Sequence, residues 1–394
     1  RRRRGSTRSP RSGMFRRAAV LAALAAALGG AQAEEESGQG LKLSGYYKNL
    51  LARSETVLAG RERYTVDLNR LRLELRGKPA ENVALDLQYD NEVLLGSYLH
   101  TGQFALQKDQ PPDQYWDAEA NYAEAGSYYG RHRLYRASVT LSAGETDVRL
   151  GRQRIAWGTG RFWSALDLLN PFSPIALERE ERVGVDAALL EHKFGPLSRL
   201  SAVYAPRHER KDSTMALNWH ANTAGADYSL VAGRFRREDV VGADIATQIG
   251  TTGVRAELTR NERETGPAYR RAVLAADHAF ANTLTLSGEL YYNGAGAGER
   301  TAYDFASLFA GRIQNVGRRY FGGFLSYEIT PLIKWSNFLV VNLADRSRFY
   351  SPGLRLSLQA NLDLTLGVQL FGGSQGSEYQ RFNDLYYVQL QWFY

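Results

Sequence analysis

The chain of 394 residues contains no cysteine, only two methionines and 11 prolines. Without cysteine it has no disulfide framework, no thiolate metal site and no covalently attached haem. Apart from a short apolar run near the N-terminus, it lacks the ~18 apolar residues in a row that a membrane-spanning helix needs. The six histidines form no H-E-x-x-H motif and no i, i+4 pair, so the sequence predicts neither a metal site nor a cofactor.

The N-terminal residues are strongly basic. Arg1–Gly13 hold six arginines and no acid, and Met14 then opens an apolar run that closes on Ala31-Gln32-Ala33. This order is that of a secretory signal peptide with an A-x-A cleavage site. We expect residues 1–13 to be an upstream extension and residues 14–33 the signal peptide. A basic nucleic-acid-binding arm is the competing interpretation, but no interleaved aromatic residues favour it.

The mature chain, residues 34–394, is close to neutral. Removing residues 1–33 takes away eight arginines and no acid, so 41 basic residues face 42 acidic ones and the net charge changes from +7 to −1. No nucleic-acid or other polyanionic partner is therefore expected. The mean hydropathy of −0.39 is low for a membrane protein. A β-barrel accounts for this value, because only alternate residues of its strands face lipid.

The C-terminal residues alternate with the period of a strand. Tyr386, Val388 and Leu390 share one face with Trp392 and Tyr394, and the residues between them form the other face. A terminal aromatic residue at this spacing is typical of the closing strand of an outer-membrane barrel, which the barrel assembly machinery reads. We assign Leu390, Trp392 and Tyr394 as the assembly signal. The alternative is an edge strand of a soluble sandwich, which would normally carry charge or proline.

Similar alternation recurs along the whole chain. Leu362–Leu370 places apolar side chains on every second position over about ten residues, roughly the length of a tilted membrane-crossing strand. Short links, such as those near residues 77–82 and 360–361, alternate with long polar ones, such as 95–131 and 294–318. This pattern predicts an all-β transmembrane antiparallel barrel of about 18 strands, with 16 as the alternative. Its location would be the outer membrane, with lipid as its surroundings.

The segment Asp147–Arg182 is the most informative internal stretch. Gly151-Arg152-Gln153, followed by Gly158 and Arg161, resembles the G-R-Q-x(4)-G-x-x-R signature of alginate-export-type outer-membrane porins. The resemblance covers about 15 residues closely, and Trp157-Gly158-Thr159 stands where Tyr-Gly-Asp is common in that family. It implies a porin-type barrel of 18 strands, and alginate itself is not carried over as the substrate.

The same segment predicts a narrowed pore. A glycine bulge at Gly151 would redirect the arginines after it, and Pro171 and Pro174 prevent a long helix. Because the segment is apolar and aromatic, we expect this extracellular loop to fold into the barrel. The predicted constriction residues are Arg149, Arg152, Arg154, Arg161, Asp167, Glu178 and Arg182. The alternative is that these arginines only form ion pairs that hold the loop to the wall.

Charged side chains at alternate strand positions predict a water-filled lumen. The predicted lumen wall comprises Arg70, Arg72, Arg76, Asp86, Asp90, Arg136 and Arg355. Facing charges across a constriction produce selectivity, and arginine matches carboxylates well. We therefore predict a porin for diffusion or export of small polar solutes, with anionic solutes as the finer hypothesis.

Two other functions remain open from the sequence alone. One is a barrel sleeve around a multihaem cytochrome, which would make that cytochrome a periplasmic partner. The other is an outer-membrane hydrolase, because Gly372–Gly376 fits G-x-S-x-G around Ser374. That motif needs a strand-to-helix turn, and here a strand enters a polar loop instead. No catalytic residue and no enzymatic activity is therefore predicted.

Overall fold

The computed structural model describes residues 40–58, 60–108, 110, 114–171, 173–178, 184–309 and 311–394. The expected upstream extension and signal peptide lie outside these ranges, as does Arg182. The strands in chain order are β1 (Gly40–Glu55), β2 (Arg63–Ala80), β3 (Val83–Leu95), β4 (Glu119–Ala125), β5 (Tyr128–Ala143), β6 (Thr146–Gln153), β7 (Val185–Lys193), β8 (Ser198–Ala205), β9 (Thr214–Thr223), β10 (Ala226–Phe235), β11 (Glu238–Ile249), β12 (Thr252–Arg263), β13 (Tyr269–Ala279), β14 (Thr285–Asn293), β15 (Arg319–Thr330), β16 (Ile333–Asn342), β17 (Arg348–Gln359), β18 (Leu362–Gly372) and β19 (Leu385–Phe393).

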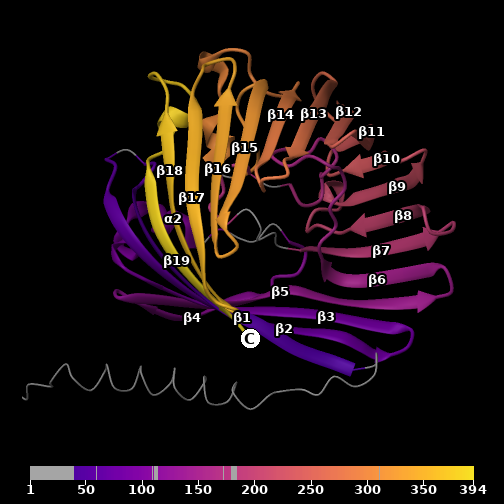
Figure 1. Ribbon diagram of the computed structural model, residues 1–394, viewed down its shortest axis with the longest axis horizontal. Helices are drawn as coiled ribbons and strands as arrows, with labels where there is room; N and C mark the ends of the chain where they lie inside the picture. Colours follow the sequence, from indigo (N-terminus) through magenta and orange to yellow (C-terminus); the bar gives the residue numbers. More distant parts are fainter. Residues whose placement is uncertain are drawn as a thin grey trace, which may run out of the picture.

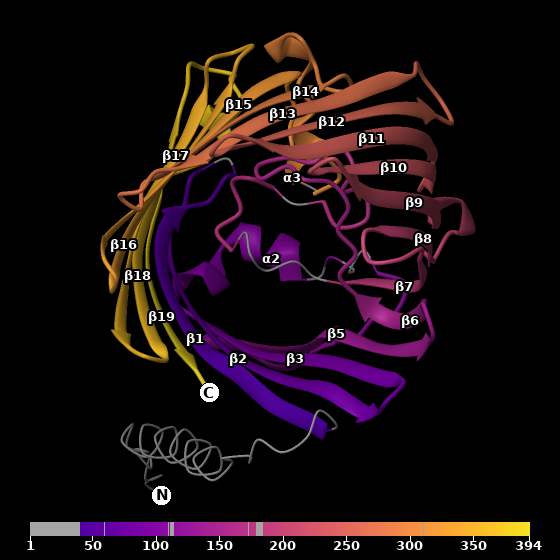
Figure 2. The same ribbon diagram turned by 45° about the vertical axis from the view of Figure 1, so that its right-hand side comes forward.

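These strands form one antiparallel sheet that closes into a barrel, because β1 pairs with β19 (Figures 1 and 2). The sheet has 19 strands, but β3 pairs directly with β5, and β4 pairs with β5 alone. The closed ring therefore has 18 strands, which confirms the expected architecture. Because the first and last strands pair, the 18-stranded ring itself has no free edge, as a membrane-spanning sheet requires.

β4 fills a gap beside the long strand β5. The short strand β6 pairs with Ala137–Ala143, whereas β4 pairs with the earlier part of β5, from Tyr128 to Arg133. β4 therefore takes the place next to β5 that a longer β6 would occupy. The chain is free to leave the wall after Gln153, where β6 ends.

The connections alternate between short and long, as the sequence predicts. Turns of two to five residues join β2 to β3, β5 to β6, β17 to β18 and the other pairs on that end of the barrel. The longer links on the opposite end hold the two short α-helices, α2 (Gly102–Lys108) and α3 (Phe305–Phe309). Within the described ranges, neither helix has the length and apolar character that crossing a membrane would take.

The strands show one exposed apolar face and one covered face. Exposed leucines, each 40 % to 55 % exposed, occur on seven strands around the ring: Leu190, Leu217, Leu230, Leu258, Leu274, Leu290 and Leu366. The residues that alternate with them point inward, and many are buried. Single exposed leucines on so many strands form the apolar outer surface expected of a barrel in lipid.

The bulge predicted at Gly151 is wrong. β6 pairs with both β5 and β7 through this residue without a shift of register. Gly151 instead has a φ of +114°, and a Cβ there would lie 2.2 Å from the Ala137 carbonyl oxygen. The glycine is needed because the backbones approach closely, and the alternation of the strand continues through it.

The C-terminal strand closes the barrel. Tyr394 and Gly45 exchange two backbone hydrogen bonds of 3.1 Å, and the Tyr394 hydroxyl donates to the Arg72 carbonyl at 2.8 Å. Trp392 lies opposite Tyr47 and Leu390 opposite Asn49. All three residues of the predicted assembly signal therefore lie at the seam between the first and last strands, and their role in assembly stays a prediction.

Candidate functional site

The chain between β6 and β7 packs against the wall of the barrel. We call residues 154–178 the inner segment. Its side chains Ile155, Leu166 and Leu169 pack with buried apolar residues of β7–β11, including Leu189 and Val240. In Figure 2 the magenta chain that follows β6 lies within the ring. These partners alternate with the exposed leucines, so the segment lies on the inward-facing side of the strands.

A second apolar cluster fixes the middle of the inner segment. Phe162 and Trp163 are almost fully buried among aromatic residues of β14–β17. The Trp163 ring stacks on Tyr291 with centroids 5.3 Å apart, and its Nε1 donates to Asn315 Oδ1 at 3.0 Å. Phe162 lies over Gly322, where any larger residue would collide with the ring. Burying two such side chains contributes several kcal/mol, about 1.5–3 for a phenylalanine alone.

The carboxylate of Glu257 on β12 binds the backbone of the inner segment. It accepts hydrogen bonds from the amides of Thr159, Gly160, Ala165 and Leu166. The Ser164 hydroxyl also donates to it at 2.9 Å. A carboxylate buried in this way is stabilised by charge-assisted hydrogen bonds. It also satisfies amides that no regular secondary structure pairs.

Glu289 on β14 likewise binds backbone amides of the inner segment. It accepts from the amides of Arg161 at 2.8 Å, Phe162 at 3.2 Å and Trp163 at 2.7 Å. Together the two glutamates bind seven backbone amides. The glycines of the signature permit this path: Gly158 has a φ of +93°, and a Cβ at that position would meet Ser164 and Glu257.

The end of the inner segment contacts the other side of the ring. The Ile175 carbonyl accepts from Gln369 Nε2 of β18 at 3.3 Å. Glu178 then forms a bidentate pair with Arg70 of β2, at 2.7 and 2.9 Å, and binds Lys48 of β1 at 2.9 Å. Burial alone would raise the pKa of Glu178, but the charges and hydrogen bonds of Arg70 and Lys48 outweigh it and lower the pKa.

Glu178 docks onto a buried network of charges, which we call the ionic sector. Its members are inward-facing side chains on β1, β2, β3 and β5: Lys48, Arg70, Arg72, Asp90, Glu92, Arg131 and Arg133. Arg72 binds Asp90 through two hydrogen bonds of 2.6 Å. Glu92 is shared by Arg70 at 2.7 Å and Arg131 at 2.6 Å. Each buried charge in this network therefore has an opposite partner.

Aromatic rings complete the ionic sector. The Arg72 guanidinium lies 3.8 Å from the Tyr135 ring centre and 5.2 Å from that of Tyr46. Such cation–π contacts add to the ion pair and orient the guanidinium. The sector is thus a fixed structure in which the arginines are held by carboxylates and rings.

The predicted constriction residues separate into two groups. Arg152 is buried and paired with Asp186 at 2.8 and 3.0 Å, and it also binds the Trp116 and Leu134 carbonyls. Arg149 donates to Thr140 within the wall. Neither contacts the inner segment in these interactions.

The other predicted constriction residues belong to the inner segment itself. Arg154 is exposed, and Arg161, with a side chain 38 % exposed, lies over the Phe324 ring at 5.0 Å and 3.9 Å from Asp277. The buried Asp167 accepts from the Asn170 amide at 3.2 Å. Glu178 makes the crossing contact described above.

The predicted lumen-wall residues outside the ionic sector are less buried. Arg76 pairs with Asp86 at 3.1 Å, and both side chains are more than a third exposed. Arg136 lies 5.3 Å from the Tyr135 ring centre, and Arg355 is exposed. Glu257 and Glu289 are the site residues that sequence reasoning missed. Their only signal is an acid at an inward position of a strand.

No group of three or more histidine, aspartate and glutamate side chains in the described part of the chain is placed to hold a metal ion. Ser374 lies in the exposed turn after β18, and its carbonyl accepts from Ser377. The turn leads to β19 through a single 3₁₀ turn at Tyr379–Arg381, which is not the strand-to-helix arrangement of a nucleophile elbow.

Comparisons with known proteins agree with this fold. No protein-family model matches the chain, and no curated protein matches it. The chain is similar to the solved structure of OpdK, an outer membrane protein of Pseudomonas aeruginosa, with a TM-score of 0.57, 10 % identity, and 90 % of this chain and 98 % of that chain covered. OccAB4 of Acinetobacter baumannii has a TM-score of 0.55 and 8 % identity, with 92 % and 100 % covered.

A third similar structure is OccK2 (OpdF) of Pseudomonas aeruginosa in complex with glucuronate. It has a TM-score of 0.53 and 11 % identity, and covers 92 % of this chain and 99 % of that chain. At these identities the likeness concerns the fold. The fold of this chain is therefore a closed 18-stranded antiparallel barrel, similar to those of the Occ and Opd outer-membrane porins, which confirms the expected porin-type fold.

Proposed function

We propose that the chain forms an outer-membrane channel for the passage of small polar solutes, and that the inner segment narrows its lumen. The observation that carries the proposal is the span of this segment. It is bound by Glu257 and Glu289 on β12 and β14 and again, through Glu178, by Lys48 and Arg70 on β1 and β2. A segment attached to both sides of a ring reduces the open cross-section.

The finer proposal concerns the charge of the solute. Arg154 and Arg161 have exposed side chains on the inner segment, whereas the arginines of the ionic sector are already paired. Arginines without a buried partner are the ones that can attract a passing anion. A glucuronate complex of a similar barrel makes carboxylate-bearing solutes reasonable probes. Asp277 close to Arg161 would keep the preference modest.

The test is electrophysiology of the refolded protein in planar bilayers. We expect single channels of fixed conductance and a reversal potential that indicates weak anion preference in a salt gradient. Glucuronate added on one side should lower the ion current by occupying the channel. Absence of any conductance from correctly folded, heat-modifiable barrels would contradict the proposal.

A single charge reversal tests the selectivity. Arg161→Glu should shift the reversal potential toward cations, because it replaces the exposed positive charge with a negative one beside Asp277. Arg270→Glu on β13 is the matched control, since Arg270 is exposed and alternates with inward residues. A shift of equal size in both variants would mean that the inner segment does not set the selectivity.

A sleeve around a cytochrome needs an open lumen. The contacts of the inner segment with β12, β14, β18, β1 and β2 disfavour that function. The channel is therefore the function that the geometry supports best.

A further inference from the structure

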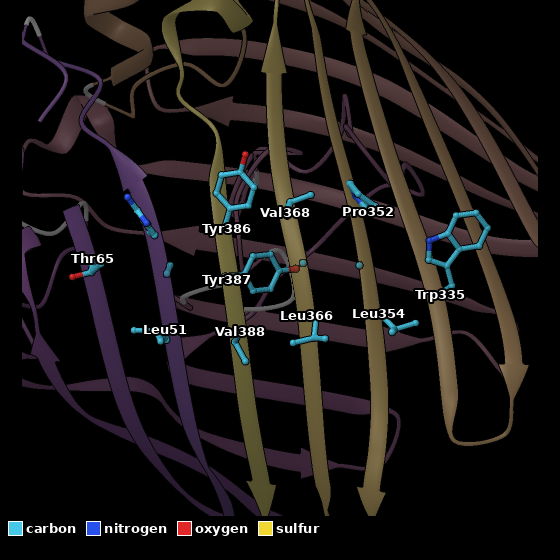
Figure 3. Close-up of a pocket in the computed structure, with 14 residues that line it drawn as sticks. Leu51, Thr65, Trp335, Pro352, Leu354, Leu366, Val368, Tyr386, Tyr387 and Val388 are labelled. Atoms are coloured by element: carbon cyan, nitrogen blue, oxygen red, sulfur yellow. The ribbon is translucent and has the colours of Figure 1, made fainter. Parts of the chain in front are cut away.

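The outer surface of the barrel has a groove where β16, β17, β18, β19 and β1 pass beside one another. Its volume is about 620 Å³, and its lining is mostly apolar, with Leu51, Trp335, Leu354, Leu366, Tyr386 and Val388 among the contributing side chains. Figure 3 shows these side chains on strands that run side by side. Leu366, Val388 and Leu51 are 40 % to 50 % exposed, so the groove opens on the lipid side of the wall.

Regular strand pairing is interrupted beneath the groove. Pro352 has no N–H to donate, and the pairing between β17 and β18 skips Ser351 and Pro352. Gly353 and Gly367 lie opposite each other on the inward face, because they alternate with outward residues such as Leu366. The floor and rims of the groove are therefore formed by the outward apolar side chains of these strands.

The two ends of the groove differ in chemistry. Trp335 is near the start of β16, on the end of the barrel with short turns. At the other end, Arg53 on β1 lies opposite Tyr386 on β19, two residues before β1 enters a long link. Arg53 is exposed, shares the outward face with Leu51, and has no ion-pair partner within the described ranges. The groove thus runs from an apolar end to a cation beside a tyrosine at the membrane interface.

We propose that this groove is a binding site for a phosphate-bearing lipid, with one acyl chain along the apolar floor and the phosphate on Arg53. An acyl chain matches the groove because the lining offers dispersion contacts over a length that crosses five strands. A phosphate matches Arg53 because a guanidinium donates two parallel hydrogen bonds to its oxygens. Long links mark the extracellular end, so the lipid belongs to the outer leaflet.

This inference does not rest on the channel function. The groove and the inner segment lie on opposite faces of the wall, so conductance and lipid retention report on them separately. A channel that fails to conduct leaves the lipid site untouched, and a barrel that retains no lipid leaves the channel untouched.

The first test uses native mass spectrometry of the full-length barrel after incubation with phosphatidylglycerol, or with diacylglycerol that carries the same acyl chains but no phosphate. One arginine near a surface attracts an anionic lipid about fivefold, so the wild type should retain phosphatidylglycerol about fivefold better. Arg53→Gln should abolish this preference, whereas Arg270→Gln, at an exposed outward position on β13, should keep it. Equal preference in Arg53→Gln and wild type would overturn the role of Arg53.

The second test fills the groove. Leu366→Trp places a large side chain in it and should reduce retention of both lipids, while Leu258→Trp, an equally outward leucine on β12, should not. Heat-modifiable migration on gels confirms that each variant is folded. If Leu366→Trp and Leu258→Trp retain the same amount of lipid, the groove is not the binding site.

A third measurement tests whether the acyl chain of the lipid lies in the groove. Phosphatidylglycerol with brominated acyl chains should quench the fluorescence of Trp335. The Trp335 signal is the difference in fluorescence between the wild type and the Trp335→Phe variant. Quenching should fall in Arg53→Gln at limiting lipid. Unquenched Trp335 in the wild type at saturating brominated lipid would overturn the proposal.

Discussion

Two regions of the inner wall of the barrel bury their inward-facing side chains in different ways. In the ionic sector, buried charges on β1, β2, β3 and β5 neutralise one another directly across neighbouring strands. From β7 to β17 two clusters of inward apolar residues pack against the inner segment. In the first region most pairs lie within the wall itself, and Glu178 of the inner segment adds a carboxylate that binds Lys48 and Arg70. The second is complete only when a distant piece of chain is bound to it.

This difference predicts that substitutions in the two regions will have different effects. Because the ionic pairs belong to the wall, breaking them should destabilise the barrel. Because the apolar region depends on the inner segment, removing that segment should change permeation and expose apolar surface. The seam between β19 and β1 lies beside the ionic sector and closes the ring that contains both regions.

The largest effect is expected at the seam. Deleting Trp392–Tyr394 removes the Tyr394 hydrogen bonds to Gly45 and the Arg72 carbonyl, together with the aromatic end of β19. We expect insertion into the outer membrane to stall and the protein to aggregate in the periplasm. Membrane fractionation and heat-modifiable migration measure this. Trp392→Phe keeps the aromatic character and serves as the control. Normal assembly of the deletion variant would contradict the assembly-signal assignment.

The next effect is on conductance. Deleting Ser164–Pro174 removes Leu166 and Leu169 from their cluster. It also removes two amides and the Ser164 hydroxyl from Glu257. If the inner segment narrows the lumen, single-channel conductance should rise severalfold. An unchanged conductance would place the segment outside the permeation path, and the link between β3 and β5 would become the next candidate.

Breaking the ionic sector should cost stability. Asp90 is fully buried and binds Arg72 and Arg133, so Asp90→Ala leaves buried positive charge without its partner. Removing one partner of such a pair costs about 3–5 kcal/mol in free energy of unfolding. Asp86→Ala on the same strand is the control, because the partly exposed Asp86–Arg76 pair is worth only about 0–1 kcal/mol. Denaturation of the refolded barrels in urea measures both. Equal losses would show that burial does not distinguish the two pairs.

The smallest effect concerns pH and lies in the long links. Glu378, between β18 and β19, is buried and accepts from the Tyr320 hydroxyl, the Asn342 amide group and the Val316 amide. Burial raises the pKa of Glu378 to about 7, with the nearby Asp345 adding to it. The pKa of Glu378 in the folded protein is above the unfolded value of 4.5, so the protonated side chain stabilises the fold. This stabilisation is fully present below pH 4.5 and is lost as the pH rises through about 7.

Limited proteolysis at Arg381 measures that change. Cleavage of the wild type should become faster between about pH 5 and pH 8, after correction for the pH dependence of the protease. Glu378→Gln should flatten the profile. Glu378 faces Asp345, Tyr303 and Tyr379 as well as its hydrogen-bond partners, so Asp345→Asn tests the remaining charge. A profile that is identical in Glu378→Gln would assign the pH dependence elsewhere.

The wall was predictable from the sequence because it is built from local rules. Alternation of apolar and polar residues, and turn residues such as those at 360–361, determine strands, faces and ring size with information from a few neighbouring positions. Pairs such as Arg72–Asp90 follow once the register of β2 and β3 is known. The inner segment was harder, because Glu257 and Glu289 are 91–128 residues away from the amides they bind.

Arg152 is a residue whose contacts the sequence did not reveal. Its place in a family signature suggested a role in the pore, whereas its guanidinium binds Asp186 and two carbonyls. Asp186 is 34 residues further along, beyond the inner segment. Sequence spacing could not reveal the register that places Arg152 on β6 opposite Asp186 on β7.

The distance in sequence between the inner segment and its glutamates also sets an order of events during folding. The amides of residues 159–166 have no stable partners until β12 and β14 are in place, and Glu178 has none until β1 and β2 have joined the ring. Contacts between residues about a hundred positions apart form late, because closing such long loops costs entropy before any contact is gained. The barrel would therefore pass through a wide, water-filled intermediate, and docking of the segment would be the final, separately observable kinetic phase.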